Sequence, residues 1–333
     1  MQPNYSIIIC SYNPELRIFE RCLNAVSQLN TEGLSVEVIL IDNNSSVPLA
    51  GLTIVKDMAA KLDNFTLVNE AKQGLTAARL AGVAKATGEV VVFFDDDNEP
   101  EPDYLQELSR LNKSHNHIVA WGPGNISVDF IDGIAADIEG YARSVFQERH
   151  TTTIAYANTR TWQDCYPFGT GMSVKASYLQ NYVRLVSENA FTLSDRNGNS
   201  LSSGGDVQIV LTCIKQGGGA GIAPGLRLKH MIPAKRANVE YIKRLLYGVF
   251  IGGPKTRAEV FPEHYEIVRH QRMRKGKFTA MAIAGYLKLS LGSKPDDLFA
   301  FITELASNCG IYLAIDRPIP TGVKWVIKRL RLQ

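Results

Sequence analysis

The sequence predicts an α/β fold with a mostly parallel central sheet flanked by helices, and three observations predict it. Residues 6–10 and 90–94 are short, mostly apolar runs typical of strands buried on both faces, and residues 36–41, with one Glu among β-branched and apolar side chains, predict the strand between them. Stretches with apolar residues at helical spacing separate these runs. Since a strand, a helix and a strand in succession form a right-handed parallel unit, the first hundred residues are expected to build one sheet.

The elements of this first part follow one another regularly. Apolar residues at helical spacing predict helices over residues 15–29, 54–62 and 74–86, and a short apolar run predicts a strand over 65–68. Gly88 is expected to cap the third helix. The loops that follow the three buried strands should gather at one edge of the sheet, where open α/β folds bind their ligands.

The sequence after residue 100 predicts less regular structure. A glycine-bearing turn at 168–171 is expected to lead into a short strand, and the Ser-, Asn- and Gly-rich residues 194–205 are expected to form a mobile loop. The other elements expected here are a helix over 104–111, a strand over 118–122, a helix over 130–149, and a helix that begins at Asp206 and ends at the glycines 217–219.

Three adjacent carboxylates, those of Asp95, Asp96 and Asp97, follow the most apolar run directly. They repel one another and resist desolvation, so a cation is expected among them. A hard divalent ion with oxygen ligands, shared with a substrate phosphate, fits this arrangement. The alternative is a solvated acidic turn, which Asn98 and Pro100 would also favour.

Composition narrows the class of protein. The chain has 333 residues, of which 45% are hydrophobic and 21% charged, as in ordinary globular proteins, and its net charge of +3 gives no reason to expect nucleic acid as a partner. Its five widely spaced cysteines suggest neither a disulfide framework nor a zinc site. Because no basic leader or bilayer-length apolar run is seen, we expect a cytoplasmic protein, peripheral to the inner face of the cell membrane if it meets a membrane at all.

Four motifs carry a resemblance to a known family. Residues 7–13, 39–45, 69–82 and 88–97, in this order and at this spacing, resemble the family 2 inverting glycosyltransferases of GT-A fold. The resemblance covers about the first 230 residues. It implies a glycosyltransferase domain over 1–230, with a nucleotide-binding half (1–100) and an acceptor half (101–230), followed by a basic, mostly helical extension over 231–333.

The resemblance implies a nucleotide-sugar donor, commonly a UDP-sugar, and Mn²⁺ or Mg²⁺ as the cofactor. Tyr12 would stack near the base, Asp42 would accept a hydrogen bond from it, Arg79 would face the nucleotide, and Asp97 would bind the metal. The residues implied in donor binding are Ser11, Tyr12, Asn13, Asp42, Arg79, Asp95 and Asp96.

Three of these residues also have simpler interpretations. Tyr12 could be an aromatic residue of a turn with its hydroxyl in water. Asp42 could form an Asx-turn with its neighbours. Arg79 could be an ordinary surface charge on a helix.

The acceptor side of the resemblance lies later in the chain. Gly169, Thr170, Gly171 and Met172 match a loop that lines the donor-sugar and acceptor pocket in the family, and Asp206 matches the catalytic base. Gly205 occupies a position where the family has Glu, which leaves the acceptor contacts open. Asp206 could also serve as a helix N-cap. His230 matches a histidine that approaches the metal or the diphosphate, although a structural role is equally open.

Basic residues gather towards the end of the chain. Residues 235–277 contain eleven Lys or Arg against four Glu, and residues 324–331 mix basic and apolar side chains around Trp325. These residues could be solvated faces of helices. They could instead rest on an anionic membrane surface, which would suit an enzyme acting on a lipid-linked glycan.

The sequence therefore predicts a metal-dependent inverting glycosyltransferase that moves a sugar from a nucleotide diphosphate donor to a glycan or lipid-linked acceptor in surface polysaccharide synthesis. Two alternatives stay open. A sugar-1-phosphate nucleotidyltransferase would normally carry a glycine-rich phosphate loop after its first strand, and residues 11–14 are not one. A non-catalytic module that binds a glycan or nucleotide is the other, and Gly205 favours it.

Overall fold

The chain forms two compact units in the computed structural model, which describes residues 4–192, 195–196, 201–292 and 294–333. The first unit comprises Met1–Asp129, Phe146–Asn189 and Ile209–Ile232. The second comprises Phe130–Val145, Ala190–Gln208 and Pro233–Gln333. The second unit thus combines the C-terminal helices with two segments from earlier in the chain. The predicted domain boundary at residue 230 stays a prediction.

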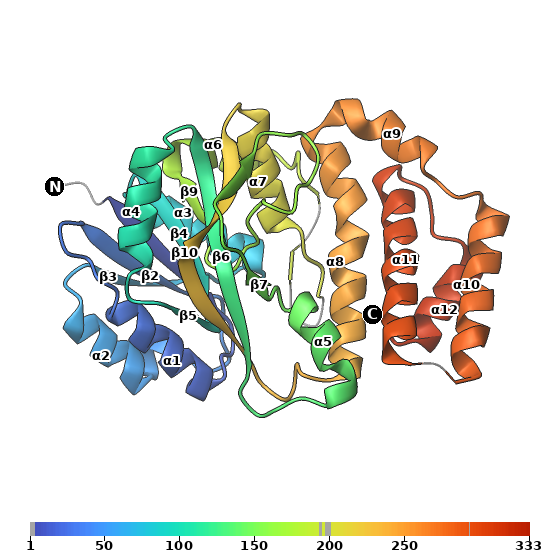
Figure 1. Ribbon diagram of the computed structural model, residues 1–333, viewed down its shortest axis with the longest axis horizontal. Coiled ribbons are helices and arrows are strands. Elements are labelled where there is room, and N and C mark those ends of the chain that lie inside the picture. The colour runs from blue at the N-terminus through green and yellow to red at the C-terminus, as the bar shows by residue number, and fades with distance from the viewer. Residues whose placement is uncertain (1–3, 193–194, 197–200, 293) are drawn as a thin grey trace. The chain divides into compact units, whose positions relative to one another are not determined.

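One mixed sheet forms the centre of the first unit (Figure 1). Its main path runs β3-β2-β1-β4-β9-β6-β10-β5, and two short strands lie off this path, with β7 paired to β6 and β8 to β10. The strands are β1 (Tyr5–Ser11), β2 (Val36–Asp42), β3 (Phe65–Asn69), β4 (Val90–Asp95), β5 (Asn98–Pro100), β6 (Ile118–Phe130), β7 (Arg149–His150), β8 (Ala155–Ala157), β9 (Ser173–Lys175) and β10 (Gly219–Ile232).

The strands predicted over the first hundred residues are confirmed, and they run parallel to one another. β1 pairs in parallel with β2 and with β4, and β2 pairs in parallel with β3. The register aligns Cys10 with both Ile41 and Asp95, so the three strands end at the same level. Ile8 and Ile9 are fully buried, as expected for a strand covered on both faces. The polar residues after these strands therefore share one edge.

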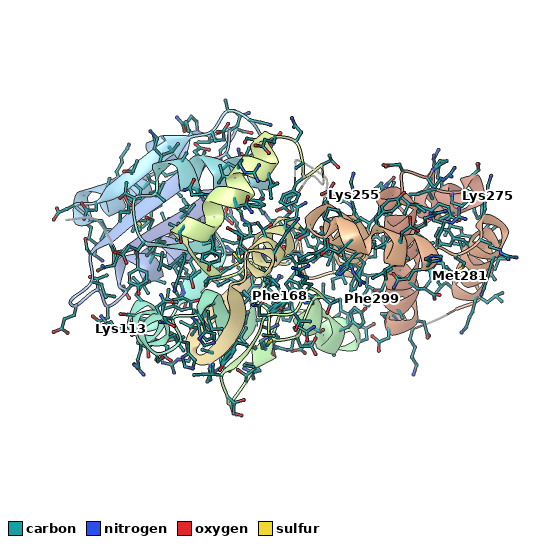
Figure 2. The ribbon with its side chains drawn as sticks, turned by 90° about the horizontal axis from the view of Figure 1, so that it is seen from above. Lys113, Phe168, Lys255, Lys275, Met281 and Phe299 are labelled. Atoms are coloured by element: carbon teal, nitrogen blue, oxygen red, sulfur yellow. The ribbon has the colours of Figure 1, made fainter. Side chains whose placement is uncertain are left out.

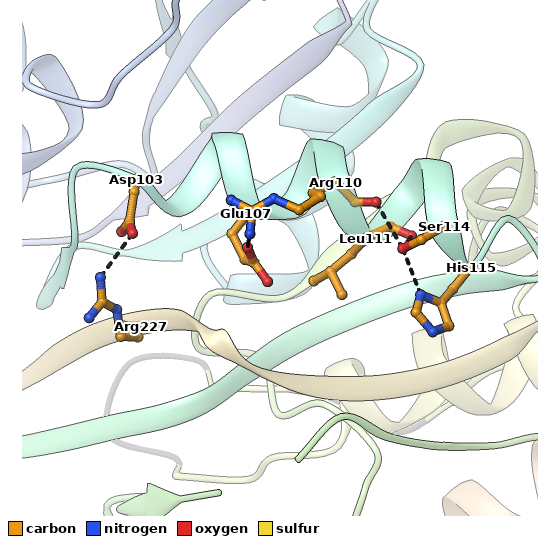
Figure 3. A network of polar contacts seen from close by, with 7 residues as sticks. All are labelled: Asp103, Glu107, Arg110, Leu111, Ser114, His115 and Arg227. Atoms are coloured by element: carbon orange, nitrogen blue, oxygen red, sulfur yellow. Dashed lines mark hydrogen bonds and ion pairs between the residues drawn. The ribbon is translucent and has the colours of Figure 1, made fainter. Parts of the chain in front are cut away.

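Helices pack against this sheet. α3 packs on β1 and β2, α4 on β10, and α6 on β9. Figure 3 shows α4 lying along β10, with Asp103 of α4's N-terminal end 2.9 Å from Arg227 of the strand. The helical elements that lie wholly or partly in this unit are α1 (Leu16–Ser27), η1 (Leu49–Gly51), α2 (Thr53–Lys61), α3 (Leu75–Lys85), α4 (Tyr104–Ser114), α6 (Ala176–Ser187) and α7 (Gly205–Lys215).

Three local expectations differ from the structure or fall outside it. Gly88 does not cap α3, which ends at Lys85 with Ala86 as its C-cap. A Cβ at Gly88 would lie 2.7 Å from the backbone nitrogen of Ser6, so glycine is needed there for the close approach of the two backbones. The helix expected over 130–149 is shorter, because residues 131–135 form a turn-containing segment before the helix. The predicted mobile loop over 194–205 lies partly outside the described residues and stays a prediction.

Helices make up most of the second unit. α8 and α11 form its main helix pair, and Gly310 permits their close crossing, since a Cβ there would lie 2.4 Å from the carbonyl oxygen of Ile251. Within the part of the chain that the structure describes, each helix is too short or too polar to cross a bilayer. The helices are α5 (Ala136–Val145), α8 (Val239–Val260), η2 (Pro262–His264), α9 (Tyr265–His270), α10 (Lys275–Ser290), α11 (Pro295–Ala314) and α12 (Thr321–Arg329).

Candidate functional site

Asp97 and His230 lie side by side at the carboxyl edge of the sheet. β5 pairs antiparallel with β10 so that Asn98 is opposite His230, and the backbone N–H of Met231 donates to the carbonyl oxygen of Asp97 at 2.9 Å. This pairing brings Nε2 of His230 to 3.5 Å from Oδ2 of Asp97, and each residue is only 7% exposed. Two of the residues predicted to bind metal are thus adjacent, although 133 positions separate them in the chain.

Hydrogen bonds fix the orientation of both side chains. Nδ1 of His230 lies 2.8 Å from the carbonyl oxygen of Phe146. A carbonyl oxygen only accepts hydrogen bonds, so Nδ1 carries the proton, and in the neutral imidazole Nε2 presents its lone pair towards Asp97. Asn98 Nδ2 donates to Oδ1 of Asp97 at 2.8 Å, which leaves Oδ2 on the side of the imidazole. Backbone or side-chain partners of this kind commonly orient metal ligands.

This pair fits a divalent cation shared with a phosphate-bearing ligand. Carboxylate oxygens suit Mn²⁺ and Mg²⁺, and imidazole is a common partner for transition metals. Among the residues that the structure describes, no group of three or more His, Cys, Asp or Glu could hold a metal. A cation held by Asp97 and His230 would therefore take its remaining ligands from phosphate oxygens and water, as Mg²⁺ commonly does.

The acids before Asp97 are tied to the strand ends around them. Ser11 Oγ donates to Oδ2 of Asp96 at 2.7 Å, and Asn98 Oδ1 accepts from the backbone N–H of Asp95 at 3.1 Å. Burial raises the pKa of the Cys22 thiol well above its ordinary value, and the charges of Asp96, Asp97 and Asp95 raise it further. Negative charge is therefore concentrated at this edge, as a cation site requires.

Asn13 joins the loops after β1 and β2, and Asp42 holds the loop after β2 in place. Asn13, in the left-handed region at φ 47°, accepts from the backbone N–H of Ser46 at 2.8 Å. The two carboxylate oxygens of Asp42 accept from the backbone N–H groups of Ser45 and Leu49, each at 2.9 Å. The Asx-turn interpretation of Asp42 therefore describes its contacts. Each carboxylate oxygen has two lone pairs and could accept a second hydrogen bond. The predicted hydrogen bond between Asp42 and a nucleotide base therefore stays a prediction.

Arg79 is a buried residue, so its interpretation as a surface charge is wrong. It is 4% exposed, and its guanidinium carbon lies 5.9 Å from the centroid of the Phe93 ring on β4. Asn43 positions the start of its helix, because Asn43 Oδ1 accepts from the backbone N–H of Gly74 at 2.8 Å. A buried cation near the carboxyl edge suits an anionic ligand, and its contact with a nucleotide stays a prediction.

The predicted loop Gly169–Met172 is buried behind β4. The backbone N–H of Phe93 donates to the carbonyl oxygen of Met172 at 2.7 Å, and the Tyr104 hydroxyl donates to that of Gly171. Gly171 has φ +70°, where a side chain would be strained. Tyr12, by contrast, is 42% exposed. Hydrogen bonds thus hold the loop against β4 and α4, while Tyr12 is exposed. The predicted roles of the loop in the donor-sugar and acceptor pocket and of Tyr12 in stacking stay predictions.

Asp206, the predicted catalytic base, belongs to the second unit. It lies in the first turn of α7, one residue inside the helix, so the predicted N-cap role does not match its position. The segment before it is held by α8, because the backbone N–H of Ser203 donates to the carbonyl oxygen of Gly248 at 3.3 Å. A Cβ at Gly248 would lie 2.1 Å from the carbonyl oxygen of Leu201. α8 therefore fixes the approach of the chain to Asp206.

An ion-pair group supports the strand pair that carries the metal-ligand candidates. Glu99 of β5 accepts from Lys229 Nζ at 2.9 Å and from Arg21 Nε at 2.7 Å. Burial alone would raise the pKa of the Glu99 carboxyl, but the hydrogen bonds and charges of Lys229 and Arg21 outweigh burial and hold this pKa below its ordinary value. Glu99 therefore links α1, β5 and β10 beside Asp97 and His230.

Comparison with known proteins assigns the family. Residues 6–181, more than half of the chain, match the model of glycosyl transferase family 2. The mixed sheet with an acid-bearing strand at its carboxyl edge agrees with the GT-A fold predicted for such proteins. The chain belongs to glycosyl transferase family 2.

Individual relatives differ in what their names state. The inactive polypeptide N-acetylgalactosaminyltransferase-like protein 5 of Mus musculus is 25% identical over 263 residues, which is 74% of this chain and 58% of the relative. Glycosyltransferase AglE of Haloferax volcanii is 27% identical over 213 residues, 62% of this chain and 59% of the relative. The chain thus spans less than two thirds of the length of these relatives. The solved structure of TarS residues 1–349 from S. aureus has 15% identity and a TM-score of 0.47, over 98% of this chain and 91% of that one.

We predict a pH-dependent cost for removing the Glu99 charge. At pH 7, Glu99→Gln is expected to lower the free energy of unfolding by about 1 kcal/mol, because the charge pairs with Arg21 and Lys229. A carboxyl with a depressed pKa stabilises the fold above its unfolded pKa of about 4.3, and this stabilisation is lost as the pH falls through the folded pKa. Denaturant unfolding at pH 7 and at lower pH measures the difference. Glu101→Gln is the control, and an equal cost of Glu99→Gln at both pH values would contradict the assignment.

We also predict that Gly248 holds the segment before Asp206. Gly248→Ala is expected to lower the free energy of unfolding by about 1–3 kcal/mol, because the new Cβ overlaps the Leu201 carbonyl group. Amide hydrogen exchange over 201–208 should become faster. Gly253→Ala in the same helix meets no atom within 4 Å and is the matched control. If both variants exchange alike, α8 does not hold this segment.

Proposed function

We propose that the chain transfers a sugar from a nucleotide diphosphate donor, with UDP as the nucleotide, to a hydroxyl of a glycan or lipid-linked acceptor. The adjacency of Asp97 and His230, with the imidazole oriented by the Phe146 carbonyl group, carries this proposal. Family membership supports it, because the family resemblance implies such a donor at the same edge of the sheet. Surface polysaccharide synthesis is the biological role that we infer.

The departing nucleoside diphosphate determines what the carboxyl edge must do. As the bond from the anomeric carbon to the diphosphate oxygen breaks, that oxygen gains negative charge. A divalent cation, Mn²⁺ or Mg²⁺, held by Asp97 and His230 would stabilise this charge. Arg79 would add a fixed positive charge, and Tyr12 would stack on the base. Asp96 is held by Ser11 and would stay beside the site without moving.

The acceptor hydroxyl needs a base as it attacks. We assign that role to Asp206, because a carboxylate side chain can act as a general base. It would take the hydroxyl proton while the acceptor oxygen forms its bond to the anomeric carbon opposite the leaving group. One displacement of this kind inverts the anomeric configuration and needs no enzyme nucleophile.

A non-catalytic nucleotide- or glycan-binding module is the second candidate. Gly205 favours it, because the family resemblance leads us to expect Glu there, and a relative in mouse is named as inactive. A glycosyltransferase and a non-catalytic module would both bind the nucleotide, but only the glycosyltransferase would transfer the sugar. Assays of binding and of turnover together therefore separate them.

We predict that Asp97→Asn weakens metal-dependent binding of UDP. Asn has an NH2 group in place of one carboxylate oxygen, so the substitution removes the negative charge of a metal ligand. Calorimetric titration in the presence of Mn²⁺ should show the affinity for UDP reduced roughly 100-fold. Asp103→Asn, which alters an exposed carboxylate paired with Arg227, is the control and should bind as wild type. Equal affinities of Asp97→Asn and wild type would contradict the metal assignment.

We predict that Asp206→Asn retains binding of UDP and loses transfer. A general base contributes about 10²- to 10⁴-fold to turnover, so release of UDP from a UDP-sugar in the presence of acceptor should slow by that factor. Stereochemical analysis of the product should show inversion with the wild type. Turnover of Asp206→Asn near the wild-type rate would overturn the base assignment, and binding of UDP without transfer by the wild type would favour the non-catalytic candidate.

A further inference from the structure

Helix α10 exposes an apolar stripe to solvent. Its members recur every three or four residues: Ala280, Ile283, Ala284 and Leu287, with Leu291 directly after the helix. Ile283 is 36% exposed, Leu287 55% and Leu291 89%. At 3.6 residues per turn these positions cover an arc of roughly 100°. Two branched apolar side chains of α10, Ile283 and Leu287, and that of Leu291 after the helix are therefore exposed to water.

The opposite face of α10 is buried, so the exposed stripe is not its packing face. Phe278 and Ala282 are fully buried, and a Cβ at Gly285 would lie 2.1 Å from the Phe301 ring of α11. α10 also meets α12, since a Cβ at Gly322 would lie 2.6 Å from Cγ2 of Thr279 and 3.6 Å from Cδ1 of Ile283. The side of α10 that carries Leu287 stays exposed. Figure 2 labels Lys275 and Met281 on this helix.

Helix α12 extends the exposed apolar surface. Trp325 is 43% exposed, and its ring meets the ring of Tyr286 at a centroid distance of 5.2 Å. The guanidinium carbon of Arg329 lies 5.3 Å from the Trp325 ring centroid. Tryptophan and tyrosine rings beside cationic side chains are typical of helices at a membrane surface. We call the stripe of α10 together with Trp325 the α10–α12 face.

Basic side chains flank the α10–α12 face. On α10 they are Lys277 and Lys288, which lie on one side of the stripe at 100° per residue, and Arg272, Arg274 and Lys275 stand before or at the start of the helix. On α12 they are Lys324, Lys328 and Arg329, all exposed. The acids nearest in sequence are Glu266, which pairs with Arg269, Asp296 and Asp297 in the first turn of α11, and Asp316 before α12. Asp297 accepts from the backbone N–H of Lys294.

Basic side chains of α8 and α9 differ from those of α10, because they form ion pairs with carboxylates. Lys243 pairs with Glu240 at 2.6 Å, and Arg269 pairs with Glu266 at 3.0 Å. Each of these charges is compensated within its own helix, and Lys243 is buried. Between 272 and 291, among the residues that the structure describes, no ion pair joins a basic side chain to a carboxylate. The uncompensated positive charge is concentrated beside the apolar stripe.

We propose that the α10–α12 face binds the surface of an anionic phospholipid membrane, with α10 lying in the plane of the interface. The apolar stripe would enter the boundary between headgroups and acyl chains, and the flanking lysines and arginines would meet the phosphates. A second copy of the chain fits less well, because it would bring two sets of like charges together. This surface does not depend on the proposed catalytic function.

Sedimentation with lipid vesicles tests the proposal. The full chain is mixed with vesicles of phosphatidylglycerol and phosphatidylcholine, or of phosphatidylcholine alone. Wild type should bind the anionic vesicles at least tenfold better than the neutral ones, and binding should fall as NaCl is raised. Leu287→Gln with Leu291→Gln should reduce binding at least tenfold, and so should Lys277→Glu with Lys288→Glu. These residues are exposed, so the fold is expected to persist, and circular dichroism checks it.

Matched controls make the outcome decisive. Leu16→Gln with Val47→Gln removes two apolar side chains that are 48% and 66% exposed in the first unit, and this double variant should bind vesicles as wild type does. Equal binding of wild type and Leu287→Gln/Leu291→Gln would overturn the proposal. So would sedimentation velocity showing a wild-type dimer that this double variant dissociates, because the face would then be covered by a second copy.

Discussion

The antiparallel pairing of β5 with β10 is the constraint on which the candidate site depends. β5 has only three residues, Asn98–Pro100, yet its pairing sets Asp97, which precedes it, against His230 near the end of β10. Without this pairing, a carboxylate after β4 and an imidazole far along the chain would have no fixed relation. The hydrogen bond of Met231 to the Asp97 carbonyl group and the ion pairs of Glu99 keep the register from slipping.

The chain divides the proposed chemistry between its two units. The first unit uses strand ends for the residues assigned to the donor: rigid backbone and short hydrogen bonds hold Ser11, Asp42 and Asp97. The second unit carries Asp206 at the start of α7, beside a helix, α8, whose glycine permits the segment to approach. The residue proposed as the base thus belongs to the second compact unit, while the residues assigned to the donor belong to the sheet of the first.

Much of the first unit was predictable from the sequence, because its signals are local. Apolar runs predict buried parallel strands, and the polar residues that follow such strands share one edge of the sheet. The sequence alone therefore assigns Ser11, Asp42 and Asp97 to one edge, and the register of β1 with β2 and β4 agrees. The family resemblance supplied the roles of Asp97 and Asp206, which remain proposals.

What the sequence did not reveal depends on distant contacts. The carbonyl group of Phe146 orients His230 from 84 positions away, and a backbone carbonyl leaves no trace in composition. Asn98 was noted only as a turn residue, although its amide holds Asp97 and its oxygen holds Asp95. The role of Gly88 was mistaken because a helix cap and a close approach both select glycine. The burial of Arg79 is likewise set by tertiary packing, since its helix has little amphipathic pattern.

The proposed donor site requires Asp97 and His230 to bind one cation together with a nucleoside diphosphate. Anomalous diffraction from crystals soaked with Mn²⁺ and UDP would locate both ligands. We expect a manganese peak in contact with Oδ2 of Asp97 and Nε2 of His230, with the diphosphate oxygens on the same ion. A manganese peak and a nucleotide bound elsewhere, with no ligand in contact with Asp97 or His230, would contradict the proposed donor site.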